Sequence, residues 1–475
     1  MTQRTIMITR RLKTAGFTNN NRPRSTLALG AISVALLAGC ASGVTGMSPT
    51  GTKDYLMASG RWDNNVIVID VAKALDPKND GTPNAILNRL RVTPDIDANG
   101  TGKMDTPASG QPIAVAVSAD HKRAYISNHS GKSTPAQAAY FQHGWPGTYT
   151  VVDLVKAVDP ANNGTLNAVQ GYIDGKNFGA TGFAISPDQR YAAAAAAEMP
   201  DSEDGGTTIG IVDLQTNTVV RQVVQAFGKP GFPCPLPQLP RTSPDPRFGC
   251  YAGTNGIAIS PLGGGTLFTA NGGTDDVSVI SMQKALAGDP GAEIARIPTQ
   301  TGGFGMDVSP NGRLIVVAAR ENMNNGKEGN TISIIDVEKA LSRPATAEVA
   351  RVMVGTDNPA TATRPFAAAF APDGKRIVTT QFRSNNISIV DVDKALAGQP
   401  SEIRRLTLET PGGQPSRPRG IAFTSDGKHV AITGAPKSGP NTGVVWLINL
   451  DTYQVVSRVT QVGNESYLMN TFRGN

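Results

Sequence analysis

The sequence predicts an all-β fold, a seven-bladed β-propeller closed by pairing of the C-terminal strand with the first blade. Two observations support this prediction: a composition suited to strands and tight turns, and a four-strand unit that recurs along the chain. The 475 residues include 52 Gly and 33 Pro, and only 17% are charged. A chain of this length exceeds the size at which a single core usually stops growing, so a repeat architecture or several domains is expected.

The recurring unit is identified by its first and third strands. The first strand ends in Ser-Pro-Asp-Gly or a variant, a turn in which Pro presets φ, Asp bonds the local backbone and Gly accepts positive φ. A second strand follows directly, a third follows a polar loop, and a variable fourth strand ends the unit, as in a propeller blade. First strands with their turns lie at 113–120, 182–188, 256–261, 305–312, 367–374 and 420–427, and third strands lie at 66–70, 149–153, 209–213, 277–281, 332–336, 387–391 and 444–449.

The numbers of these strands predict how the ring closes. Six first strands are present against seven third strands, and the first unit, which begins at Asp54, lacks its first strand. The chain ends with surplus residues 464–475. If the segment around residues 467–469 supplies the missing strand, the ring closes without a free sheet edge. We therefore expect seven blades.

Several of these strands carry a recognisable motif. Second strands end in YISN at 125–128 and FTAN at 268–271, and a third strand reads ISIVD at 387–391. Together with the Ser-Pro-Asp-Gly turns, these motifs resemble YVTN propeller repeats over residues 53–475. The resemblance implies a fold shared with lactonase-like propellers and with the haem-d1 domain of nitrite reductases. It implies no particular activity, because one fold hosts many functions, and the chain lacks a Cys-x-x-Cys-His haem attachment motif.

Residues 1–39 are predicted to form a lipoprotein signal peptide. Basic residues precede an apolar run at 27–37, which is too short for a relaxed membrane span. The run ends in Leu37-Ala38-Gly39-Cys40, which resembles the lipobox of bacterial lipoproteins. The resemblance implies cleavage before Cys40, lipidation of its thiol, a lipidated tether over 40–52 and a propeller over 53–475. The alternative is an ordinary cleavage site followed by a chance cysteine.

The leader also accounts for the net charge. The chain carries a formal charge of +6, and residues 1–39 contain six Lys or Arg and no acidic residue. The mature chain is therefore close to neutral, which gives no electrostatic support for nucleic-acid binding. Ala41 follows the cysteine, where Asp would indicate inner-membrane retention. We expect a monomer anchored in the cell envelope at the outer membrane, facing the periplasm or the cell surface.

Two further cysteines, Cys234 and Cys250, flank a proline-rich segment. In an oxidising compartment they are expected to form a disulfide, which would stabilise the fold by roughly 3 kcal/mol. A pair of free, buried thiols is the alternative.

The segment 95–105 imitates a calcium-binding loop. Gly100 permits a sharp turn, but the last position holds Thr106 in place of the bidentate Glu of an EF-hand. An Asx-rich turn is therefore the alternative to a structural calcium site, and no other cofactor is expected. The candidate oxygen ligands are Asp95, Asp97, Asn99 and Asp105.

Equivalent positions in successive blades indicate a candidate binding surface. In propellers the loops that enter first strands and leave second strands lie on one face, around the central channel. Structural positions repeat from blade to blade, whereas these positions vary, and they are rich in arginine in blades five to seven. The alignment places Glu198 and Arg320 at the last position of their second strands.

From this pattern we predict a polar, Arg-rich funnel. Forked hydrogen bonds from arginine suit a small anionic or carbohydrate-like ligand, or an envelope protein. Ordinary loop variability is the alternative explanation. The predicted binding residues are Arg61, Asn128, His129, Glu198, Asn271, Arg320, Arg364, Gln381, Arg383, Arg417 and Arg419.

The sequence favours a ligand- or protein-binding scaffold in the cell envelope over an enzyme. It contains no Ser nucleophile elbow, paired-carboxylate pattern or phosphate-binding loop, so no catalytic residue is assigned. The alternative is a lactonase-like or other hydrolase, with its active site in the funnel or beneath the second-blade loop that follows His129.

Overall fold

The structure, a computed structural model, describes residues 52–96, 101–103, 106–107, 110–129, 147–175, 179–197, 206–225, 252–322, 326–436 and 439–474. All of them belong to a compact unit that spans Cys40–Asn475 and is distinct from Met1–Gly39. The regular structure of this unit consists mostly of β-strands.

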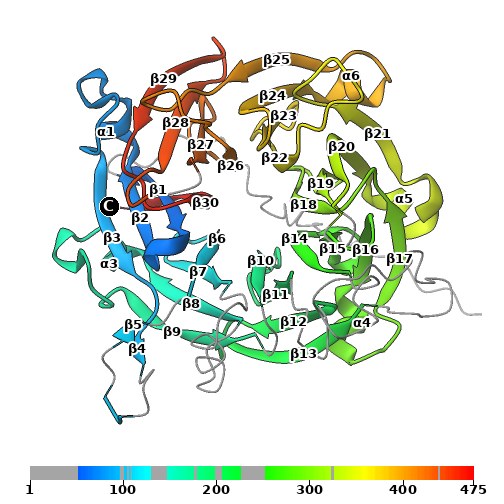
Figure 1. Cartoon of the computed structure of the whole chain (residues 1–475). Coiled ribbons are helices and arrows are strands. Elements are labelled where there is room, and N and C mark those ends of the chain that lie inside the picture. Colours follow the sequence, from blue (N-terminus) through cyan, green and yellow to red (C-terminus); the bar gives the residue numbers. More distant parts are fainter. Residues whose placement is uncertain are drawn as a thin grey trace, which may run out of the picture. The chain divides into compact units, whose positions relative to one another are not determined.

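The strands form seven four-stranded antiparallel sheets, the blades of a β-propeller, which confirms the predicted fold class and blade number (Figure 1). From the innermost to the outermost strand, the first four blades are β30 (Ser466–Gly474), β1 (Lys53–Gly60), β2 (Asn65–Asp70) and β3 (Ile86–Arg91); β6 (Pro112–Val117), β7 (Arg123–Asn128), β8 (Thr148–Asp153) and β9 (Val169–Asp174); β10 (Ala180–Ile185), β11 (Tyr191–Ala196), β12 (Thr208–Asp213) and β13 (Thr218–Val224); and β14 (Thr254–Ser260), β15 (Thr266–Asn271), β16 (Asp276–Ser281) and β17 (Glu293–Pro298).

Three further blades complete the ring. A small hairpin also follows β3, the outer strand of blade one. Blades five to seven are β18 (Gly303–Val308), β19 (Leu314–Glu321), β20 (Glu328–Asp336) and β21 (Glu348–Met353); β22 (Pro365–Phe370), β23 (Arg376–Gln381), β24 (Asn386–Asp391) and β25 (Glu402–Thr407); and β26 (Pro418–Phe423), β27 (His429–Gly434), β28 (Val444–Asn449) and β29 (Gln454–Val459). The hairpin pairs β4 (Asp95–Ile96) with β5 (Thr106–Pro107).

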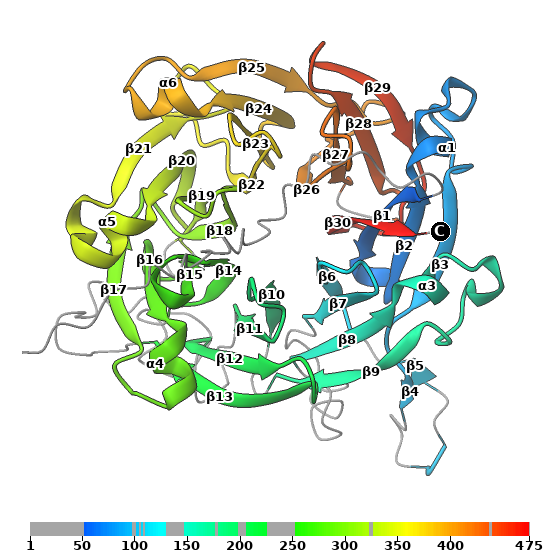
Figure 2. The ribbon, with the colours of Figure 1, turned by 180° about the vertical axis from the view of Figure 1, so that it is seen from behind.

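The ring closes between the two ends of the described chain. β30 pairs antiparallel with β1, beginning at Lys53↔Gly474. Both views show β30 beside β1 on its inner side (Figures 1 and 2). In this sheet Tyr55 and Phe472 stack with ring centroids 5.3 Å apart. The predicted closure by the C-terminal strand is therefore confirmed.

The hydrophobic core lies between neighbouring blades. Among the described residues, seven clusters of buried side chains each join one adjacent pair of sheets. One strand serves two clusters: in β2, Val66 and Val68 pack toward blade two, whereas Ile67 and Ile69 pack toward blade seven. Because both faces of the sheet are buried, the strand is a continuous apolar run in the sequence.

Short helices follow the third strand in five blades and lie on the outer rim (Figure 1). Each begins after an Asp or Ser whose side chain accepts a hydrogen bond from a backbone N–H of the first turn, as Asp70 does from Lys73 at 3.0 Å. The cap is the last residue of the strand, so the repeat itself places these turns. The helices are α1 (Val71–Leu75), α3 (Leu154–Ala157), α4 (Met282–Ala287), α5 (Val337–Ser342) and α6 (Val392–Leu396).

The innermost strands approach one another closely at glycine residues. Gly256 in β14 faces β18, where an added Cβ would lie 2.1 Å from the carbonyl oxygen of Phe304. Gly182, Gly305 and Gly420 hold the same position in their own inner strands and meet the next strand in the same way. The close spacing of neighbouring inner strands therefore excludes larger side chains at this position in four blades.

Replacing Gly256 by Ala is expected to lower the free energy of unfolding by about 1–3 kcal/mol, because β14 and β18 must separate to admit the methyl group. Gly171→Ala in the outer strand β9 is the matched control, since an added Cβ there meets nothing within 4 Å. The control is expected to change stability by no more than about 0.5 kcal/mol. Denaturant unfolding measures both values, and an equal loss in the two variants would contradict close packing of the inner strands.

Candidate functional site

On one face of the propeller the inner strands begin and the second strands end. The position compared is the second-strand residue that pairs with the first residue of the inner strand, and the alignment made from the sequence identified it correctly in five blades. It was wrong in blades three and five, because Ala196 and Ala319 hold this position; Arg320 follows by one residue, and Glu198 lies outside the described residues. The cross-strand pairs that fix the position are Ser466↔Gly60, Pro112↔Asn128, Ala180↔Ala196, Thr254↔Asn271, Gly303↔Ala319, Pro365↔Gln381 and Pro418↔Gly434.

Three of the predicted binding residues, Asn128, Asn271 and Gln381, are fully buried within their own blades. Asn128 Nδ2 donates to Thr148 Oγ1 at 3.1 Å and to Thr150 Oγ1 at 2.8 Å. Asn271 and Gln381 likewise donate to groups of their own sheets. These amides satisfy polar groups inside the blades, so the structure does not bring them to a ligand-accessible surface.

His129 is also buried. Its backbone N–H donates to the carbonyl oxygen of Gln111 at 3.1 Å. This bond ties the end of the second strand of blade two to the residue that precedes the inner strand of the same blade. The described contact of His129 is therefore structural.

The predicted arginines do come together. Arg320 Cζ lies 4.4 Å from the ring centroid of Phe304, and Arg419 Cζ lies 4.8 Å from that of Tyr467. Contacts of this kind hold guanidinium groups over apolar rings with little hydration. We define the arginine funnel as Arg61, Arg320, Arg364, Arg383, Arg417 and Arg419 together with Phe304, Phe366, Phe382 and Tyr467.

The aromatic rings form the floor of the arginine funnel. Phe366 in β22 contacts Phe304 in β18, with 4.3 Å between ring centroids, and Tyr467 in β30, with 5.6 Å. The second contact joins blades six and one, which are not neighbours, and Arg419 of blade seven contacts both Phe382 and Tyr467. Phe366 and Arg419 are fully buried. The floor therefore extends over blades five, six, seven and one.

The described carboxylates neutralise only part of the charge in the arginine funnel. Four of its six guanidinium groups pair with three carboxylates among the described ion pairs. These carboxylates keep acceptor atoms beside the arginines but leave an excess of positive charge. The pairs are Glu465 with Arg419 (2.9 Å), Glu321 with Arg320 (3.1 Å) and with Arg364, and Glu328 with Arg364 (3.4 Å) and with Arg383.

Arg61 and Arg417 are half-buried and have no carboxylate partner within the described part of the chain. Arg61 donates to Gln111 Oε1 at 3.2 Å and to Tyr467 Oη at 2.7 Å. The Arg417 guanidinium lies over the ring of Phe382, with Cζ 5.6 Å from the centroid. Both side chains therefore carry a partly buried positive charge that no described carboxylate balances.

Two other arginines of the funnel have buried donors without an acceptor. The Nε atoms of Arg364 and Arg419 make no hydrogen bond to any residue that the structure describes. Buried donors are almost always satisfied in native proteins, so each marks a place for a further acceptor. Burial lowers the pKa of Arg419, Tyr467 and Glu465 oppose that shift, and two neighbouring arginines add to it. Arg419 therefore lies in a positive and poorly hydrated environment.

In six of the seven blades the residue just before the inner strand has a left-handed backbone. Two blades use glycine there, the residue for which this conformation is easiest. A residue with a side chain is disfavoured in this conformation by roughly 1–2 kcal/mol, and strain of this kind is typical of functional sites. The left-handed residues with side chains are Gln111 (φ 47°), Arg364 (58°), Arg417 (43°) and Glu465 (58°), and the glycines are Gly179 (66°) and Gly253 (57°).

Sequence reasoning missed several of these residues. Gln111 carried a usable signal, because it precedes a proline that begins an inner strand, as Arg364 and Arg417 do. The predicted closure already placed the segment around residues 467–469 in blade one, but only the structure shows that Tyr467 contacts blade six and that Glu465 pairs with blade seven.

The other predicted sites are described only in part. Asp95 lies in β4 and pairs with Arg91 at 2.6 Å, whereas Asp97, Asn99 and Asp105 lie outside the described residues. Cys40, Cys234 and Cys250 lie outside them as well. Within the described ranges, no group of three or more His, Cys, Asp or Glu is placed to hold a metal ion. The same ranges contain no helix with the length and apolarity of a membrane span.

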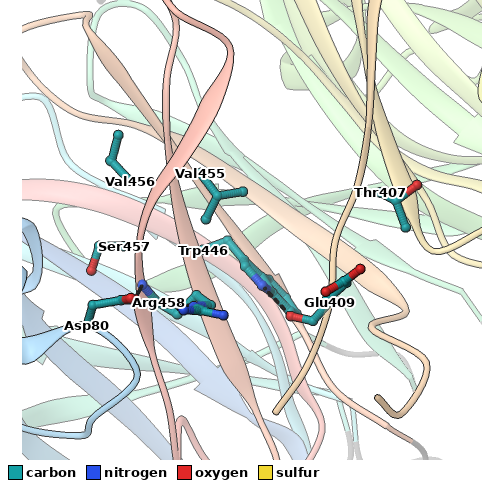
Figure 3. A pocket seen from close by; sticks show the side chains of 8 residues that line it. All are labelled: Asp80, Thr407, Glu409, Trp446, Val455, Val456, Ser457 and Arg458. Atoms are coloured by element: carbon teal, nitrogen blue, oxygen red, sulfur yellow. Dashed lines mark hydrogen bonds and ion pairs between the residues drawn. The ribbon is translucent and has the colours of Figure 1, made fainter. Parts of the chain in front are cut away.

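A separate shallow pocket of about 280 Å³ lies among residues of blades one, six and seven (Figure 3). Arg458 Nη2 pairs with Asp80 Oδ2 at 2.9 Å, and Trp446 Nε1 donates to the carbonyl oxygen of Glu409 at 3.0 Å. These donors already have acceptors, unlike those of the arginine funnel, so we do not assign the pocket a ligand. Its lining residues are Asp80, Thr407, Glu409, Trp446, Val455, Val456, Ser457 and Arg458.

Asp307 is an acidic residue at the fifth position of the inner strand β18. Asp307 Oδ2 accepts a hydrogen bond from the backbone N–H of Phe370 in the neighbouring β22, at 2.9 Å. Burial raises the pKa of Asp307 to about 7, although backbone N–H groups oppose the shift. The fifth residue of the inner strand is Asp307 in blade five and Asn470 in blade one, whereas the other blades have Ala116, Ala184, Ala258, Ala369 and Ala422.

Solved structures share this architecture. The periplasmic gluconolactonase PpgL of Pseudomonas aeruginosa is similar, with a TM-score of 0.58 and 16% identity over 88% of this chain and 99% of that one. A functionally unknown protein of Desulfotomaculum acetoxidans DSM 771 is similar, with a TM-score of 0.52 and 11% identity over 87% and 98% of the two chains. At these identities the likeness establishes the fold alone. No protein-family model and no curated protein matches the chain.

The raised pKa of Asp307 predicts a stability that depends on pH. The native state retains this proton up to about pH 7, whereas the ordinary pKa is 3.8. The stabilising contribution of the protonated group is therefore complete below about pH 4 and lost by about pH 7. Asp307→Asn is expected to unfold with nearly the wild-type free energy at pH 4 and to be more stable by up to about 4 kcal/mol at pH 8. Denaturant unfolding at both pH values measures this, and parallel pH profiles would contradict it.

Proposed function

We propose that this protein is an exported, lipid-anchored propeller of the YVTN-repeat type that binds a small anionic or carbohydrate-like ligand in the arginine funnel without catalysing a reaction. The observation that supports this most directly is the pair Arg61 and Arg417. Both guanidinium groups are half-buried, and neither has a carboxylate partner in the described part of the chain.

An anion would supply hydrogen-bond acceptors and negative charge to the arginines of the funnel. Carboxylate, phosphate and sulfate oxygens accept paired hydrogen bonds from guanidinium groups, and such charge-assisted bonds are among the strongest in proteins. The Nε donors of Arg364 and Arg419 have no acceptor among the residues that the structure describes, and Arg417 has a strained backbone. A protein selected for stability alone would use glycine at that position, as two other blades do.

The rim of the funnel also offers a flat apolar surface. Trp62 is 49% exposed, and Arg61 lies over its ring with Cζ 4.8 Å from the centroid. An exposed indole next to polar donors suits a ligand that has a ring or sugar body as well as a charged group. This supports a carbohydrate-like anion in particular.

A lactonase-like hydrolase is the second candidate, motivated by the fold likeness to the periplasmic gluconolactonase PpgL. The described carboxylates of the arginine funnel are each engaged by arginine, as Glu465 is by Arg419. That arrangement favours ligand binding over general acid–base work, which requires a carboxyl group free to exchange a proton. Incubation with lactones and esters tests the alternative, and turnover would support it.

Binding is tested at Arg417 with two variants. Arg417→Gly and Arg417→Ala both remove the guanidinium and are expected to weaken anion binding at least tenfold, because a charge-assisted hydrogen bond contributes about 1.5–3 kcal/mol. The Gly variant is expected to be about 1 kcal/mol more stable than the Ala variant, because glycine accepts the φ of 43° at this residue.

Calorimetric titration with phosphate, small dicarboxylates and sugar acids measures the binding, and denaturant unfolding measures the stability. Arg313→Ala is the control for charge, since Arg313 is 59% exposed and pairs with Glu338 away from the funnel. Unchanged anion binding in both Arg417 variants would refute the proposed site.

Lipid anchoring is tested at Cys40. Expression of the full chain in a Gram-negative host is expected to give a membrane-associated protein that incorporates labelled fatty acid. Cys40→Ser is expected to abolish the labelling and release the protein from the membrane fraction, because the thiol is the proposed attachment site. Cys234→Ser is the matched cysteine control and is expected to keep the label. A wild-type chain without label would count against the anchor.

A further inference from the structure

We propose that Glu465 is an internal competitor for the ligand: its carboxylate occupies the place on Arg419 that a ligand carboxylate or other oxyanion takes when it binds. This inference rests on the proposed anion-binding function and adds a residue that sets affinity and selectivity. Three observations support it: the contacts of Glu465, the Nε of Arg419 that has no described partner, and the charges of Arg61 and Arg417 close to Arg419.

Glu465 is held over the funnel rather than packed into the core. It precedes β30 with a left-handed backbone at φ 58°, and its side chain is 13% exposed. One carboxylate oxygen accepts from Arg419 Nη2 at 2.9 Å, and the other accepts from Trp62 Nε1. The two oxygens are thus divided between an arginine and the exposed rim residue.

Because its oxygens are divided in this way, Glu465 binds only one of the two nitrogen atoms on the Nε–Nη2 edge of Arg419. Arg419 Nε has no partner among the described residues, while Nη2 on the same edge binds Glu465. Among the described residues, the Nη1 atom donates to the carbonyl oxygens of Ala435 and Ser466, at 3.4 and 3.5 Å. A ligand carboxylate that approached the Nε–Nη2 edge would satisfy both atoms in the forked arrangement that arginine prefers. Glu465 therefore fills the position with a poorer geometry than a free anion can adopt.

The surrounding charges favour a ligand with two anionic groups. Arg61 and Arg417 lie close enough to Arg419 to act on its charge, and neither has a carboxylate partner in the described residues. A ligand that displaces Glu465 from Arg419 with one group can reach Arg61 or Arg417 with the other. A monoanion would replace Glu465 without adding charge pairing, so the exchange discriminates against it.

Glu465→Gln is expected to bind succinate about tenfold more tightly than the wild type, because the variant removes the competing negative charge and leaves the arginines in place. Acetate is the monoanionic probe and inorganic phosphate the compact oxyanion, and both are titrated calorimetrically at low salt with the purified protein. Wild-type protein is expected to bind succinate more tightly than acetate. Glu338→Gln is the matched control, since Glu338 of α5 is 64% exposed and pairs with Arg313.

Trp62→Phe tests the same competition in the opposite direction. It keeps both charges of the pair but removes the indole N–H that holds one oxygen of Glu465. The freed oxygen can then accept from Arg419 Nε, so Glu465 becomes a stronger competitor and succinate binding is expected to weaken two- to threefold. If Glu465→Gln fails to fold, this variant decides the question alone.

The outcomes separate the two proposals. Wild-type protein that binds none of the three anions would overturn the proposed function and this inference with it. Wild-type succinate binding that is unchanged or weakened in Glu465→Gln, or unchanged or strengthened in Trp62→Phe, would overturn the inference alone and make Glu465 a positioning residue for Arg419. Tighter binding in Glu338→Gln as well would reduce the effect to a general change in charge.

Discussion

The pairing of β30 with β1 is the constraint on which the rest of the structure depends. It completes the first blade, and it supplies the inner strand that contacts both β26 and β6 in the ring. The same strand carries Tyr467 into the aromatic floor, and the residue before it, Glu465, pairs with Arg419 of blade seven. One set of backbone hydrogen bonds therefore closes the fold and completes the candidate site, so the site forms only once the ring is closed.

The inner ring explains why the site is both rigid and strained. Small residues such as Gly256 let adjacent inner strands approach closely, and the residue before the strand then adopts a left-handed backbone in six blades. Glycine fits that conformation, yet Arg364 and Arg417 occupy it. The seven interblade clusters supply the stability that tolerates this local cost. The apolar packing between blades thus recurs around the whole ring, while the charged residues of the arginine funnel gather on one part of the rim.

The electrostatics of the arginine funnel follow from its aromatic floor. Rings such as Phe366 and Phe382 hold guanidinium groups away from water, which strengthens their attraction to any acceptor and raises the cost of leaving them unpaired. Within the described part of the chain, the carboxylates that pair with these groups are fewer than the guanidinium groups. This imbalance is the reason for which we propose an anionic ligand. At the outer rim, by contrast, Arg458 already pairs with Asp80.

The sequence alone determined the fold class, the number of blades and the closure by the C-terminal strand, because strand periodicity and turn chemistry are local properties that repeat along the chain. It also identified the arginines, since their positions interrupt the repeat. Only the tertiary structure decided which polar residues reach the funnel: Asn128 and Gln381 turn into their blades, and Glu465 enters from the far end of the chain. The reason is physical. Side-chain burial and cross-blade charge pairing depend on the one-residue register of each strand and on contacts between residues of different blades, which no local pattern records.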